Sequence, residues 1–140
     1  MSERDPQPPP PRPLVLIAED EVQLRRVLQK ALEREGYRVL TAGSAEGAYE
    51  LLSLELADAL LLDVRLPTMS GLALYLAILN RWPALAGRIA IMTGDAEAEE
   101  VRAWLERNPC TVLRKPFNLR EIFEWLRAAV QVRDRGRANG

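Results

Sequence analysis

Charged and hydroxyl side chains follow several apolar segments of this chain, each close to the point where the segment ends. Glu19 and Asp20 follow the run LVLIA, and Asp63 follows the run LLL in LLLDVRLPTMSG. Thr93 follows IAIM, and Lys115 closes CTVLRK. A carboxylate at the edge of a core costs free energy unless a partner or a reaction uses its charge. Together these residues offer hard oxygen ligands for a divalent cation, a hydroxyl group and one positive charge.

The composition limits the chemistry to those groups. The chain contains no His, which removes the commonest general base and metal ligand. Its single cysteine, Cys110, cannot form an intrachain disulfide. Lys and Arg total 19 against 20 Asp and Glu, so the net charge of −1 gives no basic surface of the kind that binds nucleic acid. We therefore expect no nucleic-acid partner.

Targeting segments and membrane spans are also missing from the sequence pattern. No apolar run approaches the roughly 20 residues that a membrane span needs, and the N-terminal MSERDPQPPPPRP lacks the apolar core of a secretory signal. These features predict a soluble, cytoplasmic protein with no membrane partner. The proline content of residues 1–13 predicts a tail or linker, residues 14–132 one domain, and the polar RDRGRANG of residues 133–140 a frayed tail.

Apolar segments of two lengths alternate along the domain, and this alternation predicts repeated βα units around a parallel sheet. Strands are expected at 14–18, 37–42, 57–62, 88–92 and 110–113. Helices are expected from 22 to a stop at Gly36, and at 45–56, 71–82, 96–107 and 119–132. Ligands of such sheets bind at the carboxyl ends of the strands. The polar residues that follow the strands should therefore meet in one acidic cleft.

Four motifs in register, VLIAEDE, LLLDVRLPTMSG, IMTGD and LRKPF, resemble the receiver domain of bacterial response regulators. The 30 residues from Asp63 to Thr93 and the 22 from Thr93 to Lys115 fit the spacing of that family. The resemblance covers about residues 14 to 132. It implies a single flavodoxin-like (βα)5 domain, with a five-stranded parallel sheet of order 2-1-3-4-5 and helices on both faces. IMTGD and VLRKPF are most similar to the receivers of hybrid histidine kinases.

The resemblance also implies a function for each polar residue. Asp63 would accept a phosphoryl group from the phospho-His of a histidine kinase or a histidine phosphotransfer protein, and Thr93 and Lys115 would contact that group. The module would signal by changing its partner binding, and would catalyse only its own phosphorylation and dephosphorylation. A second copy of the chain is a candidate partner, in a homodimer through the face made by the fourth helix, fifth strand and fifth helix. Mg²⁺ would have these ligands: Asp20 and Asp63 directly, Glu19 through a water, and Arg65 through its backbone carbonyl.

Three positions depart from the usual pattern or stand out within it. Val112 occupies the position, three residues before Lys115, where many receivers carry the aromatic residue of the phosphorylation switch. Arg65 and Asp95 each lie two residues beyond a site residue, at the rim where water must enter to hydrolyse an acyl phosphate. Their opposite charges could pair across the site, so we expect them to modulate the rate of dephosphorylation.

Other functions are weighed against this one. A degenerate receiver that only docks partners, without phosphorylation, is the main alternative, because Val112 departs from the switch. A haloacid-dehalogenase-type phosphatase needs a second acid two residues after its nucleophile, where this chain has Arg65. A nucleotide-binding module needs a glycine-rich first turn, and AEDEVQLRR contains no glycine. Taken alone, Glu19 and Asp20 could simply open a helix, where acidic side chains favour the positive end of the dipole.

Overall fold

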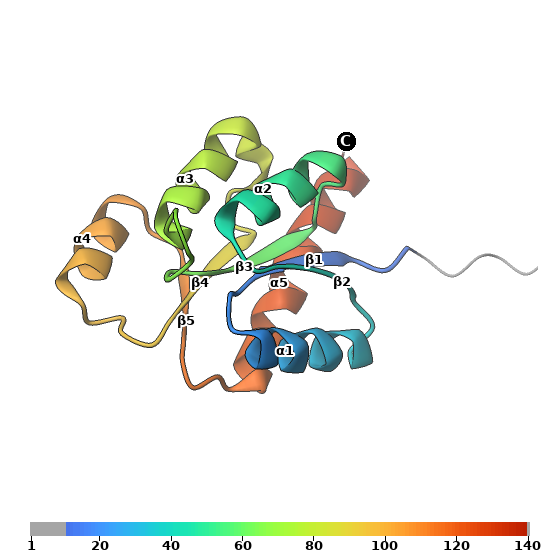
Figure 1. Cartoon of the computed structure of the whole chain (residues 1–140). Helices are drawn as coiled ribbons and strands as arrows, with labels where there is room; N and C mark the ends of the chain where they lie inside the picture. Colours follow the sequence, from blue (N-terminus) through green and yellow to red (C-terminus); the bar gives the residue numbers. More distant parts are fainter. Residues whose placement is uncertain (1–10, 140) are drawn as a thin grey trace, which may run out of the picture.

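Five parallel strands form one sheet in the order β2-β1-β3-β4-β5, with helices on both faces (Figure 1). The structure is a computed structural model that describes the backbone of residues 11–139 and the side chains of residues 11–131. The strands are β1 (Leu14–Ala18), β2 (Arg38–Ala42), β3 (Ala59–Asp63), β4 (Ile89–Thr93) and β5 (Thr111–Arg114). The helices are α1 (Val22–Arg34), α2 (Ala45–Leu54), α3 (Gly71–Arg81), the 3-10 turn η1 (Pro83–Leu85), α4 (Glu99–Arg107) and α5 (Leu119–Asn139). The predicted flavodoxin-like fold and strand order are confirmed.

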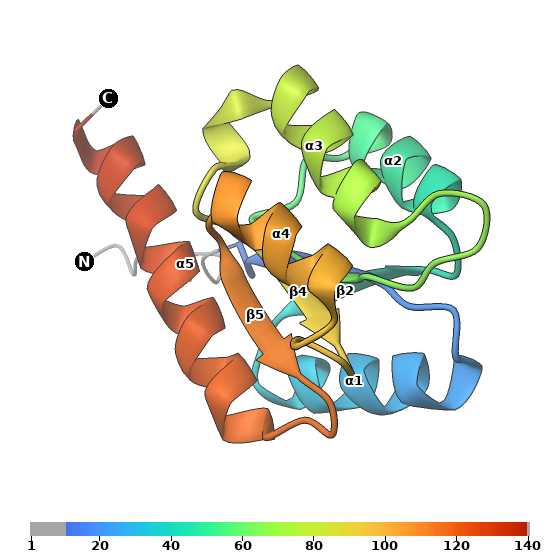
Figure 2. The same ribbon diagram turned by 90° about the vertical axis from the view of Figure 1, so that its left-hand side faces the viewer.

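The side chains of the sheet divide into two layers because successive strand residues point to opposite faces. In β1, Leu14 and Leu16 pack in the cluster that includes α2 and α3, while Val15 and Ile17 pack in the cluster that includes α1 and α5. Figure 1 shows α2 and α3 above the sheet and α1 below it, and Figure 2 shows the long α5 beside β5. Every residue of β1, β3 and β4 is buried, which explains why these strands read as continuous apolar runs.

Side-chain caps fix the start of several helices. The hydroxyl oxygen of Ser44 accepts a hydrogen bond from the backbone N–H of Gly47 at 3.1 Å, and that of Ser70 accepts one from Ala73 at 3.1 Å. Asn118 caps α5 in the same way, through Oδ1 and the backbone N–H of Arg120 at 3.0 Å. These caps place the first turn of each helix at the edge where the strands end.

The boundaries of several strands and helices differ from the predicted ones by one or two residues, and three differences are larger. Helix α4 begins at Glu99 and not at residue 96, because residues 95–98 form a turn in which the N–H of Ala98 donates to the carbonyl of Asp95. The turn η1 was not predicted. The backbone of α5 is helical as far as Asn139, where the sequence predicts a frayed tail from residue 133; Arg and Ala in that segment favour a helix.

The predicted proline-rich tail falls mostly outside the described residues, since the description starts at residue 11. Among the described residues, no helix is both long and apolar enough to cross a membrane.

Candidate functional site

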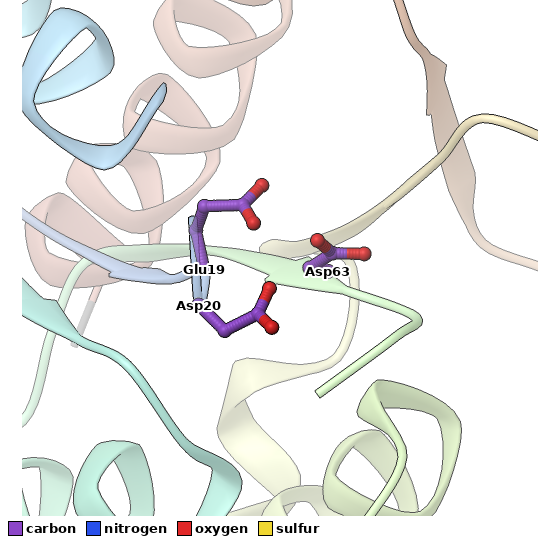
Figure 3. Close-up of side chains that lie close together, drawn as sticks. All are labelled: Glu19, Asp20 and Asp63. Carbon is purple, nitrogen blue, oxygen red and sulfur yellow. The ribbon is translucent and has the colours of Figure 1, made fainter. Parts of the chain in front are cut away.

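Three carboxylates meet where β1 and β3 end side by side. Glu19 and Asp20 follow β1 directly, and Asp63 is the last residue of β3. Carboxylate oxygens of the three residues lie within 4.8 Å of one another, and Figure 3 shows the side chains turned toward a common space. Glu19 and Asp63 are only 1% and 4% exposed, whereas Asp20 is exposed. Three like charges held this closely require a cation or a proton to offset their repulsion.

Lys115 supplies a positive charge to two of these acids. Its Nζ atom donates to Oε1 of Glu19 and to Oδ2 of Asp63, each at 2.8 Å. The residue is placed by the backbone, because its N–H donates to the carbonyl of Thr93 at 2.9 Å, which continues the pairing of β5 with β4. The Lys115–Pro116 peptide bond is cis. The ammonium group of Lys115 therefore pairs with the two buried acids, Glu19 and Asp63, while Asp20 stays exposed to solvent.

Burial and charge shift the protonation of this pair. Burial raises the pKa of Glu19 from 4.5 to about 7, and its hydrogen bond to Asp63 acts in the same direction, while the hydrogen bond from Lys115 opposes the shift. Burial lowers the pKa of Lys115, but hydrogen bonds to Asp63 and Glu19 outweigh burial, so that pKa lies above its ordinary value. Lys115 therefore keeps its charge at neutral pH, and Glu19 is poised to gain or lose a proton.

The second oxygen of Asp63 is held by the loop that follows β3. Its Oδ1 accepts a hydrogen bond from the backbone N–H of Arg65 at 2.9 Å. The loop then returns to the strand, where the N–H of Gly71 donates to the carbonyl of Val64 at 2.9 Å. A Cβ atom at position 71 would lie 1.9 Å from the carbonyl oxygen of Asp63, so only glycine fits. The sequence analysis did not identify this role of Gly71; its position eight residues after Asp63, following a proline turn, is the signal that was available.

Thr93 lies at the end of β4 and is 3% exposed. Its Oγ1 accepts a hydrogen bond from the backbone N–H of Asp95 at 3.0 Å, which leaves the hydroxyl proton free to be donated elsewhere. A cavity of about 310 Å³ opens beside it, with Arg65, Thr93 and Asp95 in its lining. Val64 and Arg65, the two residues that follow Asp63, line the same cavity.

The expected ion pair between Arg65 and Asp95 does not form among the described residues. Both side chains are exposed and line the same cavity, but the ion pair in this region joins Arg114 to Glu97 at 3.2 Å. An exposed pair contributes only about 0–1 kcal/mol, which is too little to hold two solvated side chains together. The prediction of a paired lid is thus wrong for this structure, although both residues do reach the rim.

Val112 lies on β5, half-buried, and packs against the core cluster on the side of α2 and α3. Many receivers carry an aromatic residue at this position of the strand, and this chain carries valine. The position of the aromatic switch residue is therefore filled by an aliphatic side chain.

The chain is similar to known proteins over most of its length. Residues 15–127 match the model described as the response regulator receiver domain. This chain belongs to the receiver domain family. The receiver protein CpdR of Brucella abortus is 36% identical over 108 residues, which cover 77% of this receiver and 88% of CpdR. The transcriptional regulatory protein KdpE of Mycobacterium tuberculosis is 32% identical over 118 residues, which cover 84% of this receiver and 51% of KdpE. The receiver thus spans about half the length of KdpE.

Solved structures show the same fold. A CheY-like receiver domain protein from Methanospirillum hungatei superposes with a TM-score of 0.80 at 23% identity, covering 90% of this receiver and 99% of that chain. CheY4 of Vibrio cholerae gives 0.75 at 23% identity, covering 85% and 99%. Receiver domains are signalling modules that bind Mg²⁺ at an acidic pocket and interact with histidine kinases or phosphotransfer proteins. The cluster of Glu19, Asp20 and Asp63 fits that ion, because all three side chains offer hard carboxylate oxygens.

Proposed function

We propose that this receiver accepts a phosphoryl group on Asp63 from the phospho-His of a histidine kinase or a histidine phosphotransfer protein. The observation that supports this most is the position of Asp63, which is buried at a strand end, with one oxygen bound to Lys115 and the other to the backbone of Arg65. A buried acid held from both sides presents its oxygens in a fixed direction. Fixed direction is what in-line attack on phosphorus requires.

Four groups would hold Mg²⁺: Asp20 and Asp63 directly, Glu19 through a water, and Arg65 through its backbone carbonyl. The ion, when bound, would neutralise the crowded acids and the charge of the phosphoryl oxygens. Mg²⁺ keeps several waters and needs only a few protein ligands, so the exposed Asp20 beside two buried acids suits it.

In the transfer, an oxygen of Asp63 forms a bond to phosphorus while the bond between phosphorus and the imidazole nitrogen of the donor breaks. The imidazole keeps the electron pair of the broken bond and takes up a proton, and Asp63 becomes an acyl phosphate. Lys115 exchanges its hydrogen bond with the carboxylate for one with a phosphoryl oxygen. Thr93 has an unused hydroxyl proton for a second phosphoryl oxygen.

Hydrolysis of the acyl phosphate needs a water in line behind phosphorus. Arg65 and Asp95 line the cavity beside Thr93, on the side from which such a water could arrive. We therefore propose that these two side chains set the lifetime of the phosphorylated state, each by its own contact with water. On this account the domain is a signalling module that catalyses only its own phosphoryl chemistry.

The module would act by changing its binding to a partner, and a homodimer through α4, β5 and α5 is one such partner. We further propose that residues 14–132 make up the signalling unit and residues 1–13 a spacer. A cytoplasmic location stays a prediction of the sequence. The absence of a nucleic-acid partner also stays a prediction of the sequence. The relative KdpE, by contrast, is named as a transcriptional regulatory protein.

A degenerate receiver that only docks its partners is the second candidate, and Val112 in place of an aromatic switch residue favours it. Labelling with acetyl phosphate separates the two. A phosphoacceptor gains mass only when Mg²⁺ is present, whereas a docking module gains none with or without Mg²⁺.

A further inference from the structure

Arg25, on the first turns of α1, reaches back to the loop that carries the acids. Its Nη1 atom donates to the backbone carbonyl of Glu19 at 2.8 Å. A cation near the N-terminus of a helix is unfavourable, because it faces the positive end of the helix dipole. The N-cap residue of α1, Glu21, makes no side-chain capping hydrogen bond. The charged hydrogen bond to the carbonyl of Glu19 therefore offsets the unfavourable position of Arg25 near the start of the helix.

The backbone of Glu19 is held on both sides, through its N–H and through its carbonyl. The N–H of Glu19 donates to the carbonyl of Ala42 at 3.0 Å, which continues the pairing of β1 with β2. The carbonyl of Glu19 accepts from Arg25. The exposed Asp20 side chain, by contrast, makes no hydrogen bond or ion pair within the described part of the chain. The direction of its carboxylate thus depends on the backbone, which Arg25 holds.

Gly43 provides the space that the guanidinium group occupies. A Cβ atom at position 43 would lie 2.9 Å from Nη1 of Arg25 and 3.8 Å from its Cζ, and it would meet nothing else within 4 Å. The backbone of Gly43 does not need a positive φ, so alanine is allowed there. An added methyl group would therefore push the end of the flexible Arg25 side chain away without disturbing the core.

We propose that Arg25 is a positioning residue for the metal site, which acts on Asp20 through the carbonyl of Glu19. This proposal rests on the proposed function, since it concerns the affinity of the same site. Hydrogen-bond partners outside the ligand shell typically change metal affinity by about 10–100-fold. The charge of Arg25 alone would act in the opposite direction, because a cation close to the site repels a second cation. The sign of the effect therefore separates positioning from charge.

The first experiment measures Mn²⁺ binding to the full chain by the EPR signal of the free ion. Arg25→Ala should weaken binding by about tenfold or more. Arg26→Ala is the matched control, because Arg26 is exposed and makes no hydrogen bond or ion pair in the described part of the chain. Arg25→Lys keeps a charged donor and should restore part of the affinity. Circular dichroism and thermal melts report whether each variant is folded.

The second experiment tests the same contact from the other side. Gly43→Ala should weaken Mn²⁺ binding in the same direction as Arg25→Ala, and the double variant should bind no more weakly than Arg25→Ala alone. Phosphorylation of Arg25→Ala by acetyl phosphate should approach the wild-type rate when Mg²⁺ is raised to saturation. Circular dichroism at low and at saturating Mg²⁺ shows whether this recovery occurs without a change in folding.

The outcomes distinguish this inference from the proposed function. If wild type and Arg26→Ala fail to bind Mn²⁺, the proposed function and the inference both fail. If wild type binds while Arg25→Ala binds as tightly or more tightly, the positioning role is overturned and the proposed function stands. Additive losses from Gly43→Ala and Arg25→Ala would also overturn it, because the two changes would then act through separate contacts.

Discussion

The Nζ atom of Lys115 lies 2.8 Å from Oδ2 of Asp63, although 52 residues separate them in the chain. The same nitrogen lies 2.8 Å from Oε1 of Glu19, 96 residues away. Both acids are buried, and Lys115 is the cation that satisfies them in the described structure. The stability of the domain and its proposed chemistry thus depend on one ion-paired group.

Lys115→Ala should destabilise the metal-free domain, because it leaves two buried carboxylates without their cation. Removing one partner of a buried ion pair typically costs about 3–5 kcal/mol, and we expect the lower end because Lys115 is 24% exposed in its side chain. Urea unfolding measures the loss. Mg²⁺ should recover part of it by supplying positive charge. The matched control is Lys30→Ala, since Lys30 is exposed and lies on the opposite end of α1 from the site. Equal unfolding midpoints for the two variants would contradict the pairing.

The raised pKa of Glu19 predicts how metal-free stability depends on pH. Burial raises this pKa from 4.5 to about 7, so the folded state holds a proton that the unfolded state releases above pH 4.5. The stabilisation from this proton is complete below pH 4.5, and it is lost as the pH rises through about 7. Titration of Glu19 should therefore lower the free energy of unfolding as the pH rises from 4.5 to about 7. Glu19→Gln should remove this decrease.

Glu21→Gln is the control for that measurement, because Glu21 is exposed and its side chain has no partner in the described residues. Unfolding in urea at a series of pH values, with a chelator present, gives the two curves. Adding Mg²⁺ should reduce this decrease in the free energy of unfolding, because the ion favours the charged carboxylate. A Glu19→Gln curve parallel to that of wild type would show that Glu19 does not titrate in this way.

Gly71→Ala should displace the backbone of Asp63, the proposed phosphoacceptor. The new Cβ atom would lie 1.9 Å from the carbonyl oxygen of Asp63, so the end of β3 or the start of α3 must move. Overpacking of this kind typically costs about 1–3 kcal/mol. Thermal unfolding should show the loss, and phosphorylation by acetyl phosphate should slow as well. Gly94→Ala serves as the control for stability, because a Cβ atom there would meet nothing within 4 Å. A wild-type melting temperature for Gly71→Ala would contradict the close approach.

Arg65→Ala and Asp95→Ala should each increase the rate at which the phosphoryl group is lost. The two side chains line one cavity without pairing, so we expect their effects on the logarithm of the rate to add. A change of about 1 kcal/mol in the barrier corresponds to about fivefold in rate. Loss of label after removal of the phosphodonor, in excess Mg²⁺, measures both singles and the double variant. A double variant no faster than the faster single would show that the residues act as a pair after all.

Much of the fold could be predicted because the central strands are buried on both faces. A run such as LVLIA is typical of a central strand of a parallel sheet, and the polar residues after it then fall at one edge. The convergence of Glu19, Asp20 and Asp63 follows from that rule and from the spacing of the motifs. The start of α4 was harder to predict, because residues 95–98 contain helix-forming alanines and yet form a turn, in which the N–H of Ala98 donates to the carbonyl of Asp95.

The roles of Gly71 and Arg25 could not be predicted from pattern alone. Each depends on a distance between segments: Gly71 on its approach to the carbonyl of Asp63, and Arg25 on the space left by Gly43. Many arginines in this chain are exposed, and nothing in the local sequence marks Arg25 as different from Arg26. The ion pair predicted between Arg65 and Asp95 fails for a related reason, since closeness at a rim does not fix two solvated side chains.

The most direct test of the account is the mass of the intact protein after incubation with acetyl phosphate, with and without Mg²⁺. Wild type should gain the mass of one phosphoryl group in Mg²⁺, lose it on treatment with hydroxylamine, and gain none in a chelator. Asp63→Asn should gain none under any of these conditions while melting as a folded protein. An equal gain by wild type and Asp63→Asn, or no gain by wild type in Mg²⁺, would contradict the assignment of Asp63 as the phosphoacceptor.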